Sequence, residues 1–255
     1  MRHVFKTICL KALLPALLLL LWQLGSMGHW WNAYIVPPPE RVAGSLCSLL
    51  YSGQLLHHIL VSLLRVAGGF FIAALLALPC GILLGLSRRA YSFFHVLLEF
   101  FRNVPPLALL PMLILWFGIG EASKLLIVIL ATFFPIFLNT LDGISRPDKD
   151  LLEAGQVFGL SPLAVFWHIR LPMALPAIFT GLRIGLGYSW RSLIGAEMIA
   201  ASAGLGYMIL DGEEMARPDV IIVGILTIGL LGILADGLLR RLSQRSVLLR
   251  GGDAA

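Results

Sequence analysis

The sequence predicts an all-α integral membrane protein with about six transmembrane helices. Of its 255 residues, 58% are hydrophobic and only 13% are charged, whereas soluble domains carry about 25% charged residues. The mean hydropathy of +0.90 points the same way. A soluble core of this size could not cover so much apolar surface. The composition therefore excludes an ordinary soluble enzyme, a disordered chain and a disulfide scaffold.

Uncharged runs of about 20 residues, the length that crosses a bilayer, mark the predicted spans. Five runs stand out, at residues 12–39 (most apolar over 13–24), 66–87, 103–120, 125–141 and 220–235. A further run, 171–196, is long enough to span but contains Arg183 and Arg191. The basic residues before the first run resemble the start of a signal peptide. No A-x-A cleavage site follows, so we expect an uncleaved first helix.

The positions of the cations predict the orientation, because cytoplasmic loops carry more Lys and Arg. With the N-terminus inside, most of the 19 Lys and Arg residues fall on the inner side. These are Arg2, Lys6, Lys11, Arg88, Arg89, Arg102, Arg146, Lys149, Arg170, Arg240, Arg241, Arg245 and Arg250. The outer segments hold Arg41, Lys124 and Arg217. We expect both termini inside, and the net charge of +5 is a topology signal rather than a nucleic-acid signal.

The runs divide the chain into three parts. Residues 1–54 contain the first span and an outer segment with three consecutive prolines, Pro37 to Pro39. Residues 55–245 form the main membrane domain, which opens with an interfacial helix over 55–64, and residues 246–255 are a cytoplasmic tail. The glycines of the second run favour close helix packing. The outer acidic run 211–219 is expected to be a solvated loop.

The longest inner segment, residues 145–172, predicts two short amphipathic helices. Asp148 suits a helix start, and Gly159 suits a left-handed stop. Ser161 and Pro162 restart a helix as its N-cap and first residue, and Pro172 either ends it or marks the entry to the next span. Both helices carry an apolar stripe. Such helices dock into a groove of a partner protein or lie on the inner leaflet.

The same segment resembles the E-A-A loop of membrane subunits of ATP-binding-cassette importers. That pattern is E-A-A, three residues, G, nine residues and then I-x-L-P. Gly155 takes the place of the second Ala, a change small enough to keep close approach to a partner. The resemblance implies that seven residues couple this chain to an ATPase subunit: Glu153, Ala154, Gly155, Gly159, Ile169, Leu171 and Pro172.

Four more segments resemble the branch of this family that contains permeases for nitrate, taurine and other sulfonates, and bicarbonate. They are 102–124, 181–187, Ala196-Glu197 and 204–207, so the likeness covers roughly residues 55–245. The resemblance implies a type I importer permease bundle in a bacterial inner membrane, surrounded by lipid, that carries a small anionic solute. It also implies three partners: a second permease copy in a homodimer, ATPase subunits that bind ATP and Mg, and a periplasmic or lipid-anchored binding protein, which the acidic run 211–219 could touch. No cofactor or metal is expected on this chain, and the three cysteines lack metal-ligand spacing.

Prolines and charges inside the runs are candidates for the translocation pathway. Arg183 and Arg191 project about 80° apart on a helix, and a cation within a span usually faces the bundle interior. Both could lower the barrier for an anion, or each could pair with an acid, of which Glu197 is the nearest along the chain. The third run has three prolines that serve either a gate or a structural kink: Pro105, Pro106 and Pro111.

Other functions fit the sequence less well. Gly187-Tyr188-Ser189 contains the G-x-S of a serine protease, but no His follows His168 to act as its base. The sequence has no G-x-x-x-x-G-K-[ST], so we expect neither ATP hydrolysis nor any catalytic residue on this chain. The main alternative is an ion-coupled secondary transporter, which would usually show related halves and acidic residues in its spans. The same architecture could also carry an uncharged organic solute.

Overall fold

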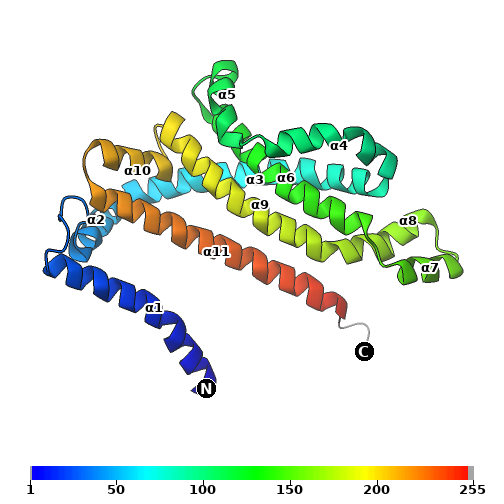
Figure 1. Cartoon of the computed structure of the whole chain (residues 1–255), viewed down its shortest axis with the longest axis horizontal. Helices are drawn as coiled ribbons and strands as arrows, with labels where there is room; N and C mark the ends of the chain where they lie inside the picture. Colours follow the sequence, from blue (N-terminus) through cyan, green and yellow to red (C-terminus); the bar gives the residue numbers. More distant parts are fainter. Residues whose placement is uncertain (1, 252–255) are drawn as a thin grey trace.

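The predicted all-α class is confirmed by a computed structural model, which describes the backbone of residues 2–251 and the side chains of residues 13–243. Every regular element in this part of the chain is a helix. The helices are α1 (Arg2–Met27), α2 (Pro39–Tyr51), α3 (Gln54–Leu86), α4 (Arg88–Asn103), the 3-10 helix η1 (Pro106–Leu109), α5 (Leu110–Phe117), α6 (Glu121–Ser145), α7 (Lys149–Val157), α8 (Pro162–Val165), the π-helix η2 (Phe166–Arg170), α9 (Leu171–Ala200), α10 (Leu205–Glu214) and α11 (Pro218–Gly251). Figure 1 shows α3, α6, α9 and α11 as long, roughly aligned rods, with α7 and α8 at one end and α2 and α10 at the other.

Four helical stretches among the described residues are long and apolar enough to cross a membrane: α3, α6, residues 162–200 and residues 218–243. The predicted spans 66–87, 125–141, 171–196 and 220–235 fall on these four stretches. The separate interfacial helix predicted over 55–64 is wrong, because α3 runs unbroken from Gln54. The chain turns one residue earlier, at Gly53, whose φ of +76° suits a residue without a Cβ.

The run 103–120 does not form one straight helix. α4 ends at Asn103, and the following pair of η1 and α5 is bent from it by 84°. Val104 and Pro105 each precede a proline, which disfavours the helical region, and both are extended (ψ 118° and 125°). α5 then has only eight residues before Gly118 stops it at φ +78°. Counted as one broken span, this pair brings the described total to five.

α1 supplies a further apolar helix whose described part, Leu13–Met27, is shorter than the other four. Figure 1 shows it standing away from the rods, beside α2. Trp22 Nε1 donates to the carbonyl of Pro37 at 3.1 Å, and Gln23 donates to Glu40 at 3.0 Å. The leucines of α1 are largely exposed, as expected for a helix surrounded by lipid.

α6 lies at the centre, between α3 and α9, and small residues let the three backbones approach closely. A Cβ added at Gly81 of α3 would lie 2.9 Å from the carbonyl oxygen of Phe137. One added at Gly181 of α9 would lie 3.0 Å from that of Pro135. The close helix packing predicted for the glycines of the second run is therefore confirmed at Gly81. These contacts make α3, α6 and α9 one packed unit.

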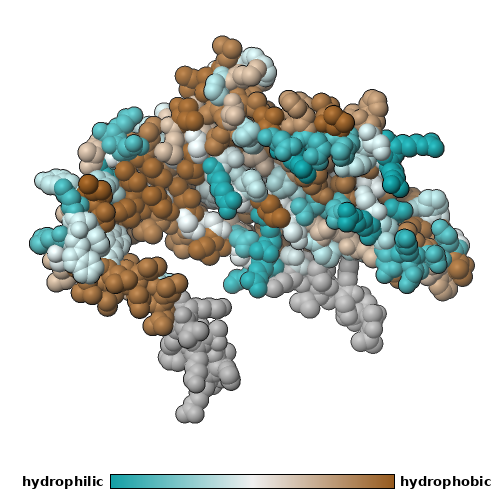
Figure 2. Space-filling model, viewed as in Figure 1, coloured by the Kyte–Doolittle hydropathy of each residue, from teal (hydrophilic) through white to brown (hydrophobic). Residues whose placement is uncertain are grey.

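Much of the described surface of the molecule is apolar. Figure 2 shows hydrophobic residues over the coloured part of α1 and much of the left half, and hydrophilic residues over α4 and at the right-hand end, where α7 and α8 lie. Between residues 225 and 238, every exposed residue of α11 is apolar. These faces suit the hydrocarbon of a bilayer.

The acidic run 211–219 is only partly the solvated loop that was predicted. Glu213 and Glu214 are exposed, but Asp219 is buried. Its carboxylate accepts a hydrogen bond from Ser45 of α2 at 2.5 Å and pairs with Arg217 at 3.3 Å and Arg41 at 3.5 Å. Asp219 therefore fastens α2 to the start of α11, because a buried carboxylate needs such partners.

Candidate functional site

The first helix of residues 145–172, the predicted inner loop, ends as its sequence predicts. Asp148 caps α7 by accepting from the N–H of Asp150 at 2.9 Å. At the other end, Gly159 has φ +67°. Its N–H donates to Gln156, and the N–H of Leu160 donates to Gly155, both at 3.0 Å. This pair of bonds is the Schellman arrangement that stops a helix.

The second helix of the loop begins as predicted but does not end as a separate element. The Oγ of Ser161 accepts from the N–H of Ala164, and Pro162 is the first helical residue. α8 passes through the π turn η2 directly into α9. Pro172, which has no N–H and whose ring would crowd a regular turn, follows this wider turn and thus marks the entry to the span. Of the two alternatives predicted for Pro172, the structure thus shows the second, entry to the next span.

Two positions of the E-A-A pattern meet inside the loop. Gly155 is the buried residue of α7, and a Cβ added there would lie 2.8 Å from Cδ1 of Ile169 in η2. The close approach that its small size allows is therefore to this chain's own Ile169. Arg170 holds the loop to α6 by donating to the carbonyl of Ile144 at 3.4 Å.

The remaining pattern residues lie at the surface of the loop. Glu153, Ala154 and Gly159 are exposed, whereas Leu171 and Pro172 are half-buried at the start of α9. Beyond them the loop presents an apolar tip, formed by Val157 (85% exposed), Phe158 (83%) and Leu163 (68%). Glu153 and Ala154 precede Val157 and Phe158 by four residues, so they lie on the same faces of α7. Figure 1 shows that this part projects beyond the ends of α6 and α9.

The prolines of the third run lie at the bend. Pro105 occupies the break after α4, and Pro111 is exposed on α5. Pro106 lines an apolar cavity of about 690 Å³ between α4 and α6, together with Ile184 and Tyr188 of α9. The bend thus lies at the wall of an open space beside α9.

The two arginines of α9 have different surroundings. Arg183 makes a two-pronged ion pair with Asp236 of α11, Nε to Oδ1 at 3.0 Å and Nη2 to Oδ2 at 2.9 Å. Pairing with an acid is one of the two predicted alternatives, although the partner is Asp236 rather than Glu197. Arg191 is exposed and has no ion pair among the described side chains. Its guanidinium carbon lies 5.9 Å from the ring centroid of Tyr188.

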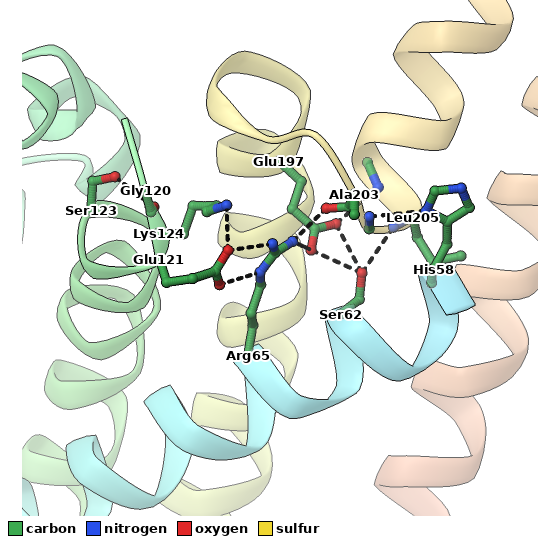
Figure 3. Close-up of polar contacts among 12 residues, drawn as sticks. His58, Ser62, Arg65, Gly120, Glu121, Ser123, Lys124, Glu197, Ala203 and Leu205 are labelled. Carbon is green, nitrogen blue, oxygen red and sulfur yellow. Dashed lines mark hydrogen bonds and ion pairs between the residues drawn. The ribbon is translucent and has the colours of Figure 1, made fainter. Parts of the chain in front are cut away.

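Glu197 belongs to a charged cluster at the end of α9, defined by Ser62 and Arg65 of α3, Glu121 and Lys124 of α6, and Glu197 itself (Figure 3). Arg65 lies between the two acids, donating to Glu197 at 2.8 Å and to both oxygens of Glu121 at 2.6 Å. Lys124 donates to Glu121 at 2.8 Å. Two cations thus face two acids, and the cluster is electrically balanced.

The backbone of the turn after α9 completes this cluster. Glu197 is 0% exposed and accepts from Ser62 Oγ at 2.9 Å and from the N–H of Gly206 at 3.0 Å. Arg65 also donates to the carbonyl of Ala203 in this turn. Figure 3 shows the turn closing over the side chains of Arg65 and Glu197. The cluster ties α3, α6, α9 and the start of α10 together. It was not predicted as a unit, although a cation and an acid inside separate spans are themselves a signal that they pair.

Comparison with known proteins agrees with this architecture. Residues 77–247 match the family described as "Binding-protein-dependent transport system inner membrane component". The putative aliphatic sulfonates transport permease protein of Escherichia coli (strain K12) is 42% identical over 223 residues, which are 88% of this chain and 85% of that protein. The taurine transport system permease protein of the same organism is 38% identical, covering 90% and 86%. The nitrate import permease protein of Synechocystis sp. (strain ATCC 27184 / PCC 6803 / Kazusa) is 33% identical, covering 87% and 82%.

A solved structure has a similar fold. It is the methionine ABC transporter MetNI in inward-facing conformations, with a TM-score of 0.59 and 19% identity, covering 76% of this chain and 97% of that one. The family match spans most of the chain, and the relatives cover nearly all of the membrane domain. The chain therefore belongs to the family of binding-protein-dependent transport inner membrane components, the permease subunits of ATP-binding-cassette importers.

Proposed function

We propose that this chain is the permease subunit of an importer for small oxyanions of the sulfonate, taurine or nitrate kind. Support comes from the names of the three relatives described above, which share this substrate chemistry at 33–42% identity. In this proposal the solute arrives on a periplasmic or lipid-anchored binding protein. Two permease copies enclose the pathway in a bacterial inner membrane, with both termini in the cytoplasm.

The inner loop is the proposed ATPase contact, and the observation that carries this is its apolar tip. Three large apolar side chains are 68–85% exposed at the end of the molecule, beside Glu153 and Ala154 of the E-A-A pattern. Burying such side chains in a groove of an ATPase subunit is favourable, because each removes apolar surface from water. ATP and Mg would be bound by that subunit.

The proposed coupling follows from the continuity of the loop with α9. Residues 162–200 form one helical stretch, so displacement of the loop by the ATPase would move α9 rather than bend a flexible link. The internal contact between Gly155 and Ile169 lets α7 move with it. ATP-driven closure of the ATPases would in this way switch the spans from inward-facing to outward-facing.

For the pathway itself, we propose that the bend at Pro105 and Pro106 serves as a gate element, because it lies at the wall of a cavity beside α9. Pro111 lies on the short helix beyond the bend and would move with it. Arg183 and Glu197 each have an opposite charge within 3.0 Å. We assign these two to holding the helices at the border of the pathway.

The test is uptake in proteoliposomes that contain the permease, its ATPase and its binding protein. Taurine, methanesulfonate and nitrate are offered as substrates. The proposal expects uptake only when ATP is present with the ATPase and the binding protein is on the opposite side. Transport driven by an ion gradient alone, with ATP and binding protein absent, would instead identify a secondary transporter. A thermal-shift screen of the binding protein that selects only uncharged solutes would overturn the substrate class.

A further inference from the structure

α9 carries three charged side chains, and the fold neutralises two of them. Arg183 pairs with Asp236, and Glu197 pairs with Arg65. Arg191 lies between them along the helix, about 12 Å from the first and 9 Å from the second at 1.5 Å per residue. No carboxylate within the described side chains pairs with it. α9 therefore has one charge that the described side chains leave uncompensated.

Arg191 lies on a face of α9 that the other helices leave exposed in the described part of the chain. The exposed residues of this open face recur every three or four positions, as one side of a helix requires: Thr180, Ile184, Gly187, Tyr188 and Arg191. The opposite side is buried against α6 and α3, with Gly185 and Ser189 among its members. The open face is thus available to something outside this subunit.

The composition of the open face differs from that of the apolar faces of α11 and α3, which suit contact with lipid. The exposed positions of α11 between 225 and 238 are all apolar, and those of α3 are largely Leu and Phe. The open face of α9 instead combines Ile184 and Gly187 with a hydroxyl, a phenol and a guanidinium. A charge facing hydrocarbon is costly, and charged residues in spans usually face a protein interior or a watery cavity. The open face therefore indicates a pathway rather than lipid.

Tyr188 places the guanidinium without consuming its hydrogen-bond donors. The 5.9 Å from the guanidinium carbon to the ring centroid is within the range of a cation–π contact. Such a contact uses the ring face, so the planar N–H fork stays free to bind two oxygens of an oxyanion. Tyr188 also lines the 690 Å³ cavity next to the Pro105 bend. The pair therefore lies at the edge of an open space.

We propose that Arg191, held by Tyr188, is a contact for the oxyanion group of the substrate as it passes along the open face of α9. This inference rests on the proposed function and deepens it. A single guanidinium without a second cation beside it suits a transport pathway, where binding must be weak enough for the solute to leave. Arg183, whose charge is already matched by Asp236, does not share this role.

The test uses the complete importer in proteoliposomes and measures the moles of methanesulfonate taken up per mole of ATP hydrolysed. We expect Arg191→Gln to lower this ratio about tenfold, the effect of losing a charge-assisted contact. Arg191→Lys should restore part of it, and Tyr188→Leu should lower it less. The matched control is Arg88→Gln, which removes another exposed arginine without an ion pair in the described structure and should leave the ratio unchanged.

Four results would overturn the inference. One is a wild-type ratio for Arg191→Gln. A second is an Arg191→Gln subunit that no longer forms the permease dimer by cross-linking, which would make Arg191 a subunit contact. A third is a lower uptake ratio for Arg191→Gln only in vesicles that contain anionic lipid, which would make Arg191 a lipid contact. A fourth is an equal fall of the uptake ratio in Arg88→Gln, which would show that removing any exposed positive charge has the same effect. Failure of the wild-type complex to import any oxyanion would instead refute the proposed function itself.

Discussion

Glu197→Gln replaces a buried carboxylate with an amide of the same shape at the centre of the charged cluster. Both oxygens of Glu197 receive donors: Oε1 from Arg65 and Ser62, and Oε2 from Ser62 and the N–H of Gly206. Whichever way the new amide is oriented, its NH₂ group faces Arg65 or Gly206, and two donors then point at each other. The hydroxyl of Ser62 can rotate to accept, but neither of the other two donors can.

The expected cost follows from the burial of this pair. Glu197 is 0% exposed and Arg65 is 9% exposed, and removing one partner of a buried ion pair costs about 3–5 kcal/mol. Because Arg65 keeps Glu121, the lower limit of about 3 kcal/mol applies. For a chain of this size, a loss of about 3 kcal/mol corresponds to a fall in Tm of roughly 6–12 °C. Tryptophan fluorescence of the purified subunit during heating in detergent measures this shift.

Glu121→Gln is the matched control, because it makes the same chemical change at the same arginine. The side chain of Glu121 is 67% exposed, and ion pairs of exposed groups contribute about 0–1 kcal/mol. Its Tm should therefore fall by less than about 4 °C. Equal shifts in the two variants, or a Tm for Glu197→Gln within about 2 °C of wild type, would refute the assignment of the cluster as a buried structural tie.

Three further predictions concern the loop and the ion pair between Arg183 and Asp236. Phe158→Asp should reduce affinity for the ATPase subunit at least about tenfold in a pull-down, as loss of a large anchor does; unchanged binding would move the contact elsewhere. Gly155→Ala should cost less than about 1 kcal/mol, because only the mobile Cδ1 of Ile169 must move, whereas an unfolded subunit would show that the loop is rigid. Asp236→Asn should lower the Tm by no more than about 4 °C, since both side chains of the pair with Arg183 are 40–50% exposed; heating in detergent checks this.

Local hydrogen-bond rules made the inner loop predictable. The cap at Asp148, the stop at Gly159 and the restart at Ser161 each depend on groups within a few residues, so sequence alone specifies them. The spans were predictable for a similar reason, because apolar length is a property of each segment. The third run, residues 103–120, shows the limit of prediction from local sequence. Its prolines predicted a bend, but the 84° angle depends on how α5 packs against α6.

Charge pairing was the part that sequence could not specify. Arg65 meets Glu197 across 132 residues, and Ser45 meets Asp219 across 174. Local preferences say that such charges need partners, but which ones meet depends on how the helices are arranged. Asp236 was for this reason missed as the partner of Arg183. The nearest acid along the chain, Glu197, lies about 21 Å further along α9 and pairs with Arg65 instead.

The positions of these ties constrain how the proposed coupling can work. The loop enters α9 at one end, and the charged cluster fastens the other end of α9 to α3 and α6. Close glycine contacts join the same three helices between these points. If displacement of the loop moved α9 alone, the charged cluster would have to break, at a cost of about 3 kcal/mol or more. If α3, α6 and α9 move together, the charged cluster and the glycine contacts all stay intact. We therefore expect α3, α6 and α9 to move as one body, so that the pathway opens along the uncovered face of α9, where Arg191 lies, and not between helices of the same subunit.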